Sequence, residues 1–449
     1  MWWKKTRLFW TRFCHRSRTR EAEVKNDMLY RKYGLLLVML FLLLIPGCST
    51  SRNTGETEAE NSSRELISGE SEAGEWEKGY DLPVEDEKKE EVREECAAVM
   101  EALSGIYEAA DKGDASNAVL PDETLEQMQQ VIGNMGYPVI TSDVYCVMEN
   151  YEIIDRFLKC CSSGSGGDAV LYILSDNGGV KRREYIFDGE QMYVISAGCT
   201  WSDSDAPIIS DVSCTRISQW TYTEKGWFAC TLCVPEPPEV SEIVNDSELI
   251  RVIPMPELYR EISEKYLLPL GYRGNNLLCS DWSAEDPGGI DYNGVFEYFY
   301  EMEYGGVFPM ERYRNGVPAE EFEALMMEYL PVDAGQLREW AAYDEESGTY
   351  AWNRLGCGNY SPSYFGTSVP EVTDLRENED GTVTLTVEAV CGMVIADDAV
   401  ITHEVTMRFE ENGSFQYLGN RILDDGIQNI PEYSYRISFR FPDQTTQIK

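Results

Sequence analysis

Histidine is nearly absent from this chain of 449 residues, which contains only two. Metal sites built from several histidines, and catalysis through a histidine base, therefore have almost no residues to use. The patterns H-E-x-x-H, G-x-S-x-G and S-x-x-K are absent too, which removes the best-known catalytic motifs of zinc and serine hydrolases. Basic residues are also scarce, because 38 Lys and Arg stand against 79 Asp and Glu. A net charge of −41 excludes a nucleic-acid-binding protein, which needs a basic surface.

The amino-terminal 47 residues have the pattern of an export signal. The apolar run Leu35–Ile45 follows Arg31 and Lys32, and as a helix it rises only about 16 Å, against a hydrocarbon core of about 30 Å. Such a run is typical of a signal peptide rather than of a membrane span. We therefore predict that residues 1–47 are removed, with Met1 or Met28 as the true start of the chain.

Gly47 stands directly before Cys48, at the end of the apolar run. A small residue before a cysteine at this place resembles the lipobox of bacterial lipoproteins. The resemblance implies cleavage before Cys48 and attachment of lipid to its sulfur, which would hold the protein at the outer face of the bacterial cell membrane. An ordinary signal peptide with a chance cysteine is the alternative.

Residues 48–87 are predicted to be a disordered acidic tether. Ser49–Glu87 contains twelve acidic and three basic residues and few large apolar ones. Such a segment cannot bury enough surface to offset the entropy cost of ordering it. We expect it to hold the folded part away from the membrane, with a disordered binding tail as the alternative, and we expect folded structure from Lys88 on.

Residues 88–255 are predicted to form an N-terminal α+β domain, because helical periodicity gives way to extended segments separated by turns. The first helix carries an apolar stripe from Val92 to Ala110, the second begins after Pro121, and the third spans residues 151–161. Asn177-Gly178-Gly179 and Asp188-Gly189 are hairpin signals between the extended segments. An antiparallel meander is expected over 169–174, 183–187, 191–199, 208–222, 227–234 and 249–253.

Residues 256–449 are predicted to repeat this order as a C-terminal α+β domain. Asp333 and Gln336 have the spacing of a capping box at the start of the last expected helix. Apolar and polar residues then alternate through Val383–Cys391 and Ile401–Phe409, as in strands with one solvated face. Helices are expected at 256–266, 291–303, 318–329 and 333–341, and 433–441 is expected to close the sheet. The fold class is therefore α+β, with helices followed by an antiparallel meander twice over.

His403 and the cysteines are the remaining candidates for chemistry. His403 shares the apolar face of its expected strand, so a buried core residue is the better interpretation and a catalytic base the weaker one. Eleven of the thirteen cysteines follow Cys48, an odd number, and we expect them to be mostly free and buried. Acidic loop residues do not match the spacing of a calcium-binding loop, so neither a metal nor another cofactor is expected.

The segment from Tyr350 to Val372 is the best candidate for a ligand site. Its glycines and prolines exclude a regular element, and it is rich in aromatic residues. Aromatic faces beside an amide and a guanidinium are typical of a site for a glycan or a peptide. Packing of a long loop on the core is the alternative. The five predicted ligand-binding residues are Trp352, Arg354, Asn359, Tyr360 and Tyr364.

Four segments are similar to a known family. YLLPLGYRGNNLLCSDW, EFEALMMEYLPV, RLGCGNYSPSYFGTSVPEV and DGTVTLTVEAVC resemble a family of uncharacterised lipoproteins of Gram-positive anaerobic gut bacteria, a domain of unknown function. The resemblance implies an anchored, extracytoplasmic protein and supplies no activity. We expect a non-enzymatic binding or scaffolding protein of the cell envelope. A carboxylate-based glycan hydrolase, or an envelope sensor that acts through a partner, is the alternative.

Overall fold

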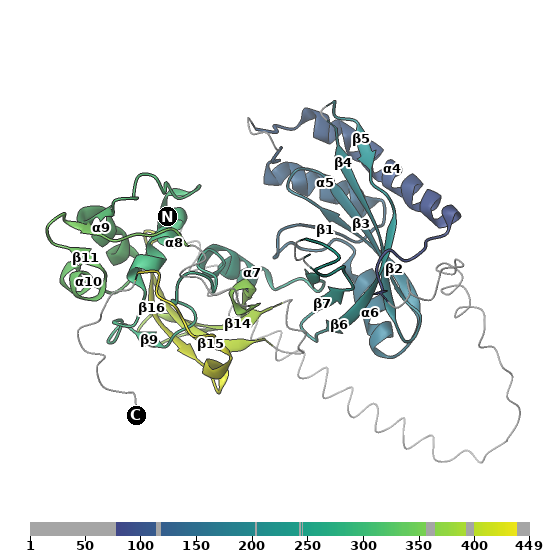
Figure 1. Ribbon diagram of the computed structural model, residues 1–449. Coiled ribbons are helices and arrows are strands. Elements are labelled where there is room, and N and C mark those ends of the chain that lie inside the picture. Colours follow the sequence, from purple (N-terminus) through teal and green to yellow (C-terminus); the bar gives the residue numbers. More distant parts are fainter. Residues whose placement is uncertain are drawn as a thin grey trace, which may run out of the picture.

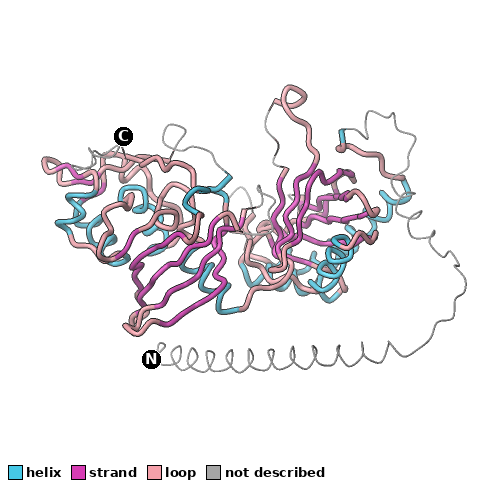
Figure 2. Tube along the Cα trace, turned by 90° about the horizontal axis from the view of Figure 1, so that it is seen from below, coloured by secondary structure: helices cyan, strands magenta, loops and turns pink. Residues whose placement is uncertain are grey.

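In the computed structural model two α+β domains lie side by side (Figure 1, Figure 2). The structure describes residues 78–113, 118–202, 204–241, 244, 246–355, 364–391 and 399–437. The predicted α+β class is confirmed. The signal segment, Cys48 and most of the expected tether lie outside the described residues. Residues 78–87 belong to the fold, because Leu82 and Val84 are buried and Leu82 bridges Cys214. The folded chain therefore starts before the expected Lys88.

One large sheet forms the centre of the N-terminal domain, with the strand order β1-β2-β3-β4-β6-β7-β8 and a short β5 beside β4. All its pairs are antiparallel except β1 with β2, which is parallel. The predicted meander is thus confirmed from β2 to β8, and β1 is an addition to it. The strands are β1 Val139–Thr141, β2 Gly167–Leu174, β3 Val180–Phe187, β4 Met192–Trp201, β5 Pro207–Ile209, β6 Ser213–Tyr222, β7 Trp227–Leu232 and β8 Ser247–Arg251.

Helices cover both faces of this sheet. The helices α4 (Asp86–Ala109) and α5 (Asp122–Asn134) pack on one face, and α6 (Tyr151–Ser162) packs on the other. Because side chains alternate along a strand, each strand contributes to two separate apolar layers. The layer under α4 contains Ile186 and Ile195, and the layer under α6 contains Tyr185 and Val194.

The C-terminal domain packs its helices against a second, smaller sheet of order β13-β14-β15-β16-β9. Asp333 caps the last helix in the predicted capping box with Gln336. The helices are α7 Glu257–Ile262, which continues as a π-helical turn over Ser263–Leu267, α8 Tyr292–Tyr304, α9 Ala319–Tyr329 and α10 Ala334–Trp340. The strands of this sheet are β9 Trp282–Ser283, β13 Val369–Glu377, β14 Val383–Val390, β15 Ile401–Phe409 and β16 Phe415–Ile422. A small sheet beside α9 consists of β10 Val317–Pro318, β11 Tyr343–Asp344 and β12 Thr349–Tyr350. Short 3₁₀ helices lie at Tyr364–Thr367 and Gly426–Asn429.

Two parts of the second sheet differ from the prediction. β16 and β9 complete it beyond β15, whereas residues 433–437 of the expected closing strand 433–441 form no strand and the rest lie outside the described residues. Tyr433 instead donates a hydrogen bond to Asp291, 2.8 Å away, at the start of α8. β13 also begins inside the segment that was predicted to be irregular.

Polar contacts join the two domains. Glu371 on β13 accepts hydrogen bonds from the indole of Trp227 on β7 and from Arg251 at the end of β8, whose nearest nitrogen is 3.0 Å away. Lys225 pairs with Glu388 on β14 beside them. Glu371 and Arg251 are both buried, so this domain junction is a desolvated cluster of charges rather than a loose surface contact.

Candidate functional site

The predicted aromatic loop does not present its residues as one surface. Trp352 is only 7% exposed, and its ring centroid lies 5.0 Å from that of Phe308 in the core. Trp352 is therefore corrected from a stacking surface to a core residue, because its packed ring offers no face to a ligand. Arg354 is exposed. Asn359, Tyr360 and the side chain of Tyr364 lie outside the described residues, so a site in this loop stays a prediction.

His403 is a core residue, as predicted. It has no exposed surface, and its two ring nitrogens lie 2.6 Å from Asn420 Oδ1 and 2.7 Å from the Tyr272 hydroxyl. The Asn420 amide donates to Ser280 O, which turns its oxygen toward the ring, so His403 Nδ1 carries the proton and donates. Burial lowers the pKa of His403 to about 4, and the hydrogen bond that it donates to Asn420 only partly opposes this.

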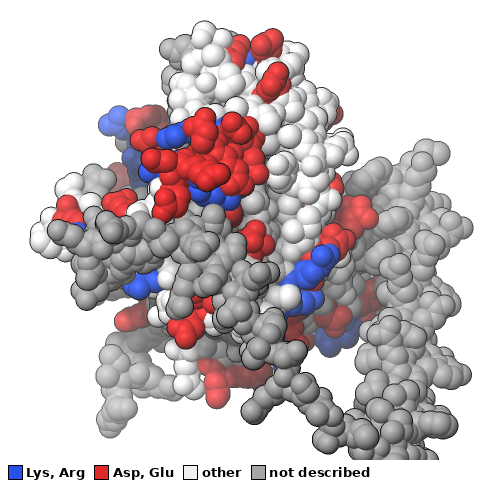
Figure 3. Space-filling view, turned by 90° about the vertical axis from the view of Figure 1, so that its right-hand side faces the viewer, with Lys and Arg blue, Asp and Glu red and all other residues white. Residues whose placement is uncertain are grey.

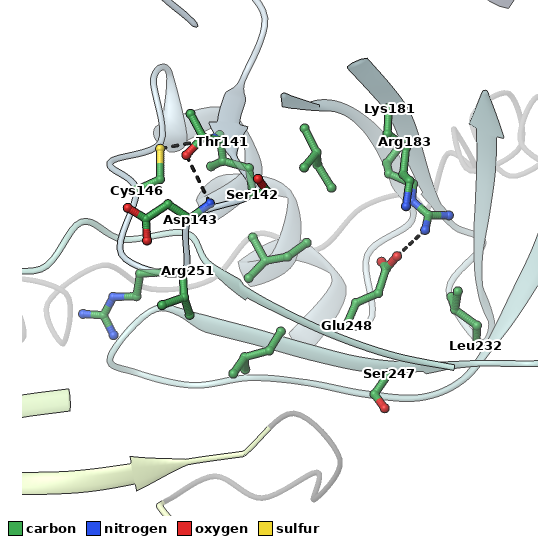
Figure 4. A pocket seen from close by; sticks show the side chains of 15 residues that line it. Thr141, Ser142, Asp143, Cys146, Lys181, Arg183, Leu232, Ser247, Glu248 and Arg251 are labelled. Carbon is green, nitrogen blue, oxygen red and sulfur yellow. Dashed lines mark hydrogen bonds and ion pairs between the residues drawn. The ribbon is translucent and has the colours of Figure 1, made fainter. Parts of the chain in front are cut away.

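A cavity of the described structure lies in the N-terminal domain, on the α6 face of the large sheet. Its volume of about 370 Å³ falls in the range of small-molecule sites. The loop after β1 forms one side, and β3 and β8 form the other (Figure 4). The polar residues that line it are Thr141, Ser142, Asp143, Cys146, Lys181, Arg183, Ser247, Glu248 and Arg251.

The alternation of β3 explains why two cations enter the cavity. Lys181 and Arg183 share a face of this strand with Tyr185 and Phe187. α6 covers the Tyr185 and Phe187 end of that face through Phe157 and other apolar residues. The other end of the face is left to line the cavity, so Lys181 and Arg183 lie beside each other at its wall (Figure 4).

Two of the three cations in the cavity wall already have carboxylate partners. Arg183 donates hydrogen bonds to Glu248 and to the Ser196 hydroxyl, which lies 2.5 Å away. The Nε of Arg183 is buried without a hydrogen-bond partner in the described structure. Arg251 points out of the cavity and pairs with Glu371 at the domain junction (Figure 4). Burial lowers the pKa of Arg251 and raises that of Glu371, with their attraction opposing both shifts. Arg251 therefore belongs to the cavity wall and to the junction at once.

Lys181 is the cation that the described structure leaves unmatched. No carboxylate among the described residues lies within 4.0 Å of its ammonium group, although the side chain is exposed. Loss of hydration at the cavity wall and the neighbouring Arg183 charge lower its pKa, and Glu248 opposes this. Lys181 therefore has no ion-pair partner in the described structure, although Glu248 and Asp143 belong to the same wall.

The carboxylates of the cavity do not form a hydrolase pair. Glu248 accepts hydrogen bonds from Arg183 and, at 3.2 Å, from Tyr185, so both of its oxygens are occupied. Asp143 accepts the backbone N–H of Tyr145, 3.1 Å away, which fixes the loop after β1. A glycosidase needs one carboxyl group that is protonated and can give its proton to the leaving group. Glu248 accepts hydrogen bonds from Arg183 and Tyr185, which favour its ionised form, so it does not suit that role.

The cysteines and the acidic residues of the described structure do not form a metal centre. The described residues contain ten cysteines, and seven of them are buried. Cys146 at the cavity wall accepts the N–H of Thr141 at 3.2 Å and contacts Gln129 at 3.4 Å. Within the described ranges no cluster of three His, Cys, Asp or Glu is arranged to hold a metal ion.

The sequence contained a signal for this cavity that the prediction did not use. Residues 181–183, Lys-Arg-Arg, are the only three consecutive basic residues in a chain of net charge −41. Strand alternation sends Lys181 and Arg183 to one face and Arg182 to the other. The other residues of the cavity wall come from the loop after β1 and from β8. They are distant from residues 181–183 in the sequence, and only the fold brings them together.

Fold and site together define a two-domain α+β protein with a small polar cavity beside its domain junction. The chain belongs to a family of unknown function (DUF6070), whose model matches residues 89–436. No curated protein and no solved structure matches the chain. Among the described helices, none is both long and apolar enough to cross a membrane.

Proposed function

We propose that the protein is a lipid-anchored, extracytoplasmic binding protein of the bacterial cell envelope, and that its ligand occupies the N-terminal cavity. The cavity carries the proposal, because it has the volume of a small-molecule site and lies beside the domain junction, where such sites are frequent. A signal segment, Cys48 and an acidic tether before residue 78 are consistent with a folded part held outside the membrane.

The anchor is tested by Cys48→Ala. The variant should fail to incorporate labelled fatty acid and should leave the membrane fraction, because the sulfur that would receive the lipid is gone. Cys160→Ala is the matched control, since it removes an exposed cysteine of the folded part and should behave as wild type. Continued labelling of Cys48→Ala would exclude lipid attachment at this residue.

The cavity is tested by Ser142→Trp, which places a large ring in it from the exposed loop after β1. Neutral sugars, sugar acids and dipeptides at millimolar concentration are the probes, and the melting temperature is the readout. At least one probe should stabilise wild type and the control Ser165→Trp, an exposed loop position outside the cavity, but not Ser142→Trp. If no probe acts, or if Ser142→Trp responds like wild type, the cavity is not the binding site.

A further inference from the structure

Basic residues are more frequent in the wall of the cavity than in the chain as a whole. The chain has about twice as many acidic as basic residues, and Figure 3 shows acidic side chains gathered in a dense patch on the N-terminal domain. The cavity wall nevertheless contains Lys181, Arg183 and Arg251 beside two carboxylates, Asp143 and Glu248, and the Arg251 guanidinium points out of the cavity. Lys181 and Arg183 lie side by side on one strand and repel each other, so their common place at the wall needs a cause.

Structural ion pairs explain only part of this charge. Glu248 balances Arg183, and Glu371 balances Arg251 from the other domain. Lys181 lies next to Arg183 with no carboxylate of the described residues at ion-pair distance. The lowered pKa of Lys181 has the same origin, since Arg183 and the loss of water both disfavour its charge. Arg183 adds a second unsatisfied group, because its Nε is buried without an acceptor in the described structure.

We propose that the cavity binds a small hydroxylated molecule through an oxyanion, a carboxylate or a phosphate, held against Lys181 and Arg183. This inference rests on the proposed function and names the class of its ligand. An oxyanion would supply the acceptor that the ammonium of Lys181 lacks, and charge-assisted hydrogen bonds of this kind are the strong ones.

The remaining lining groups suit the rest of such a molecule. The hydroxyl groups of Thr141 and Ser142 belong to the wall, and hydroxyls donate and accept equally well. A volume of about 370 Å³ is at the lower end for ligand sites, so the ligand is of the size of one sugar ring. A sugar acid or a sugar phosphate has both the charge and the hydroxyls.

The acidic surface does not prevent this binding. At physiological ionic strength charges on the surface are screened beyond about 8 Å, so the cations in contact with the ligand decide its affinity. Acidic surroundings instead act against larger polyanions, which would extend out of the cavity toward the like-charged surface. The site therefore favours a single small oxyanion.

The test compares ligands that differ in their charge and in their hydroxyl groups. Isothermal titration calorimetry at 0.15 M salt, the ionic strength of the screening argument, uses D-glucuronate, glucose 6-phosphate, lactate, inorganic phosphate and uncharged glucose with the mature soluble chain. We expect the hydroxylated anions to bind at least about tenfold more tightly than glucose, a difference of about 1.4 kcal/mol. The order of glucuronate and glucose 6-phosphate then separates a carboxylate from a phosphate ligand, and lactate and inorganic phosphate measure the oxyanion alone.

Lys181→Met tests the residue itself, because it removes the charge, keeps the stem and affects an exposed side chain. Lys181→Met should bind the hydroxylated anions at least about tenfold less tightly than wild type, while its melting temperature stays near that of wild type. Lys159→Met, which removes an exposed lysine of α6 that does not line the cavity, should bind as wild type.

Three results would overturn the inference: no anion binds, Lys181→Met binds like wild type, or glucose binds as tightly as glucuronate. The last result, with glucose binding lost in Ser142→Trp, would keep the cavity as the binding site and remove only its preference for an oxyanion. If nothing binds and Ser142→Trp changes no response, the proposed function fails as well.

Discussion

His403 and Lys181 differ in their contact with water, because His403 is fully buried and Lys181 is exposed. His403 is enclosed and has two neutral hydrogen-bond partners, so the fold keeps it uncharged. Lys181 remains at an accessible wall beside another cation. Both ring nitrogens of His403 have hydrogen-bond partners within the core, so its presence there needs no ligand or catalytic role. Lys181 has no carboxylate partner in the described structure, and our proposal gives it one in the ligand.

His403 should make the protein less stable in acid. Its folded pKa of about 4 lies below the ordinary 6.5, so the unfolded chain takes up a proton where the folded chain does not. The stability that this group contributes is complete above pH 6.5 and is lost as pH falls toward 4, by up to roughly 3 kcal/mol. Urea unfolding at several pH values measures this effect. The free energy of unfolding should fall less between pH 6.5 and pH 4 in His403→Gln than in wild type.

The same variant separates a core role from a catalytic one. His403→Gln should cost about 1–3 kcal/mol at neutral pH, as polar substitutions in a core do, while ligand binding in the N-terminal cavity stays unchanged, because His403 does not line it. Parallel pH profiles for wild type and variant would contradict the lowered pKa.

At the scale of elements, a buried charge network fixes α4 to the sheet. Glu184 on β3 accepts Lys88 from α4 and Arg182 from its own strand, both at 2.8 Å, and Arg182 also pairs with Glu95. Lys88, Arg182 and Glu184 are all less than 10% exposed. Such a network fixes the position of a helix, because a displaced helix leaves several desolvated charges without partners.

Glu184→Gln should therefore destabilise the N-terminal domain strongly. It leaves the buried cations Lys88 and Arg182 with one carboxylate fewer, and breaking a buried ion pair costs about 3–5 kcal/mol. Chemical unfolding followed by circular dichroism measures the loss. Glu311→Gln removes half of an exposed ion pair with Arg314 and should leave the unfolding midpoint unchanged. Equal midpoints for the two variants would show that the network adds nothing.

Elements coded by near neighbours were predictable, and those coded by distant contacts were not. The capping box of Asp333 and Gln336 and the alternation of β15 involve residues a few positions apart, and the structure has both. β9 has only two residues, and it exists because β16 lies beside it. The cavity is of the second kind too. Its walls come from the loop after β1, from β3 and from β8, which meet only in the folded sheet.

On the scale of the whole molecule, the cavity and the domain junction share Arg251. Its guanidinium reaches Glu371 of the C-terminal domain and lies 5.2 Å from the Trp227 ring, while the residue also lines the cavity. The Tyr145 hydroxyl, in the loop that forms the opposite wall, donates to Pro370 O next to Glu371. Both walls of the cavity therefore contact β13, and a ligand between them is in a position to affect how the two domains are held.

The two domains should accordingly unfold together while this junction is intact. Glu371→Ala leaves Arg251 and the Trp227 indole buried without their shared acceptor, so the domains should separate into two transitions in differential scanning calorimetry. Glu377→Ala, an exposed position on the same strand, should keep the single transition of wild type. Glu371→Ala should also bind glucuronate less tightly, because Arg251 and the loop of Tyr145 lose their common support. Two independent transitions in wild type, or a single one in Glu371→Ala, would mean that the charged junction does not couple the domains.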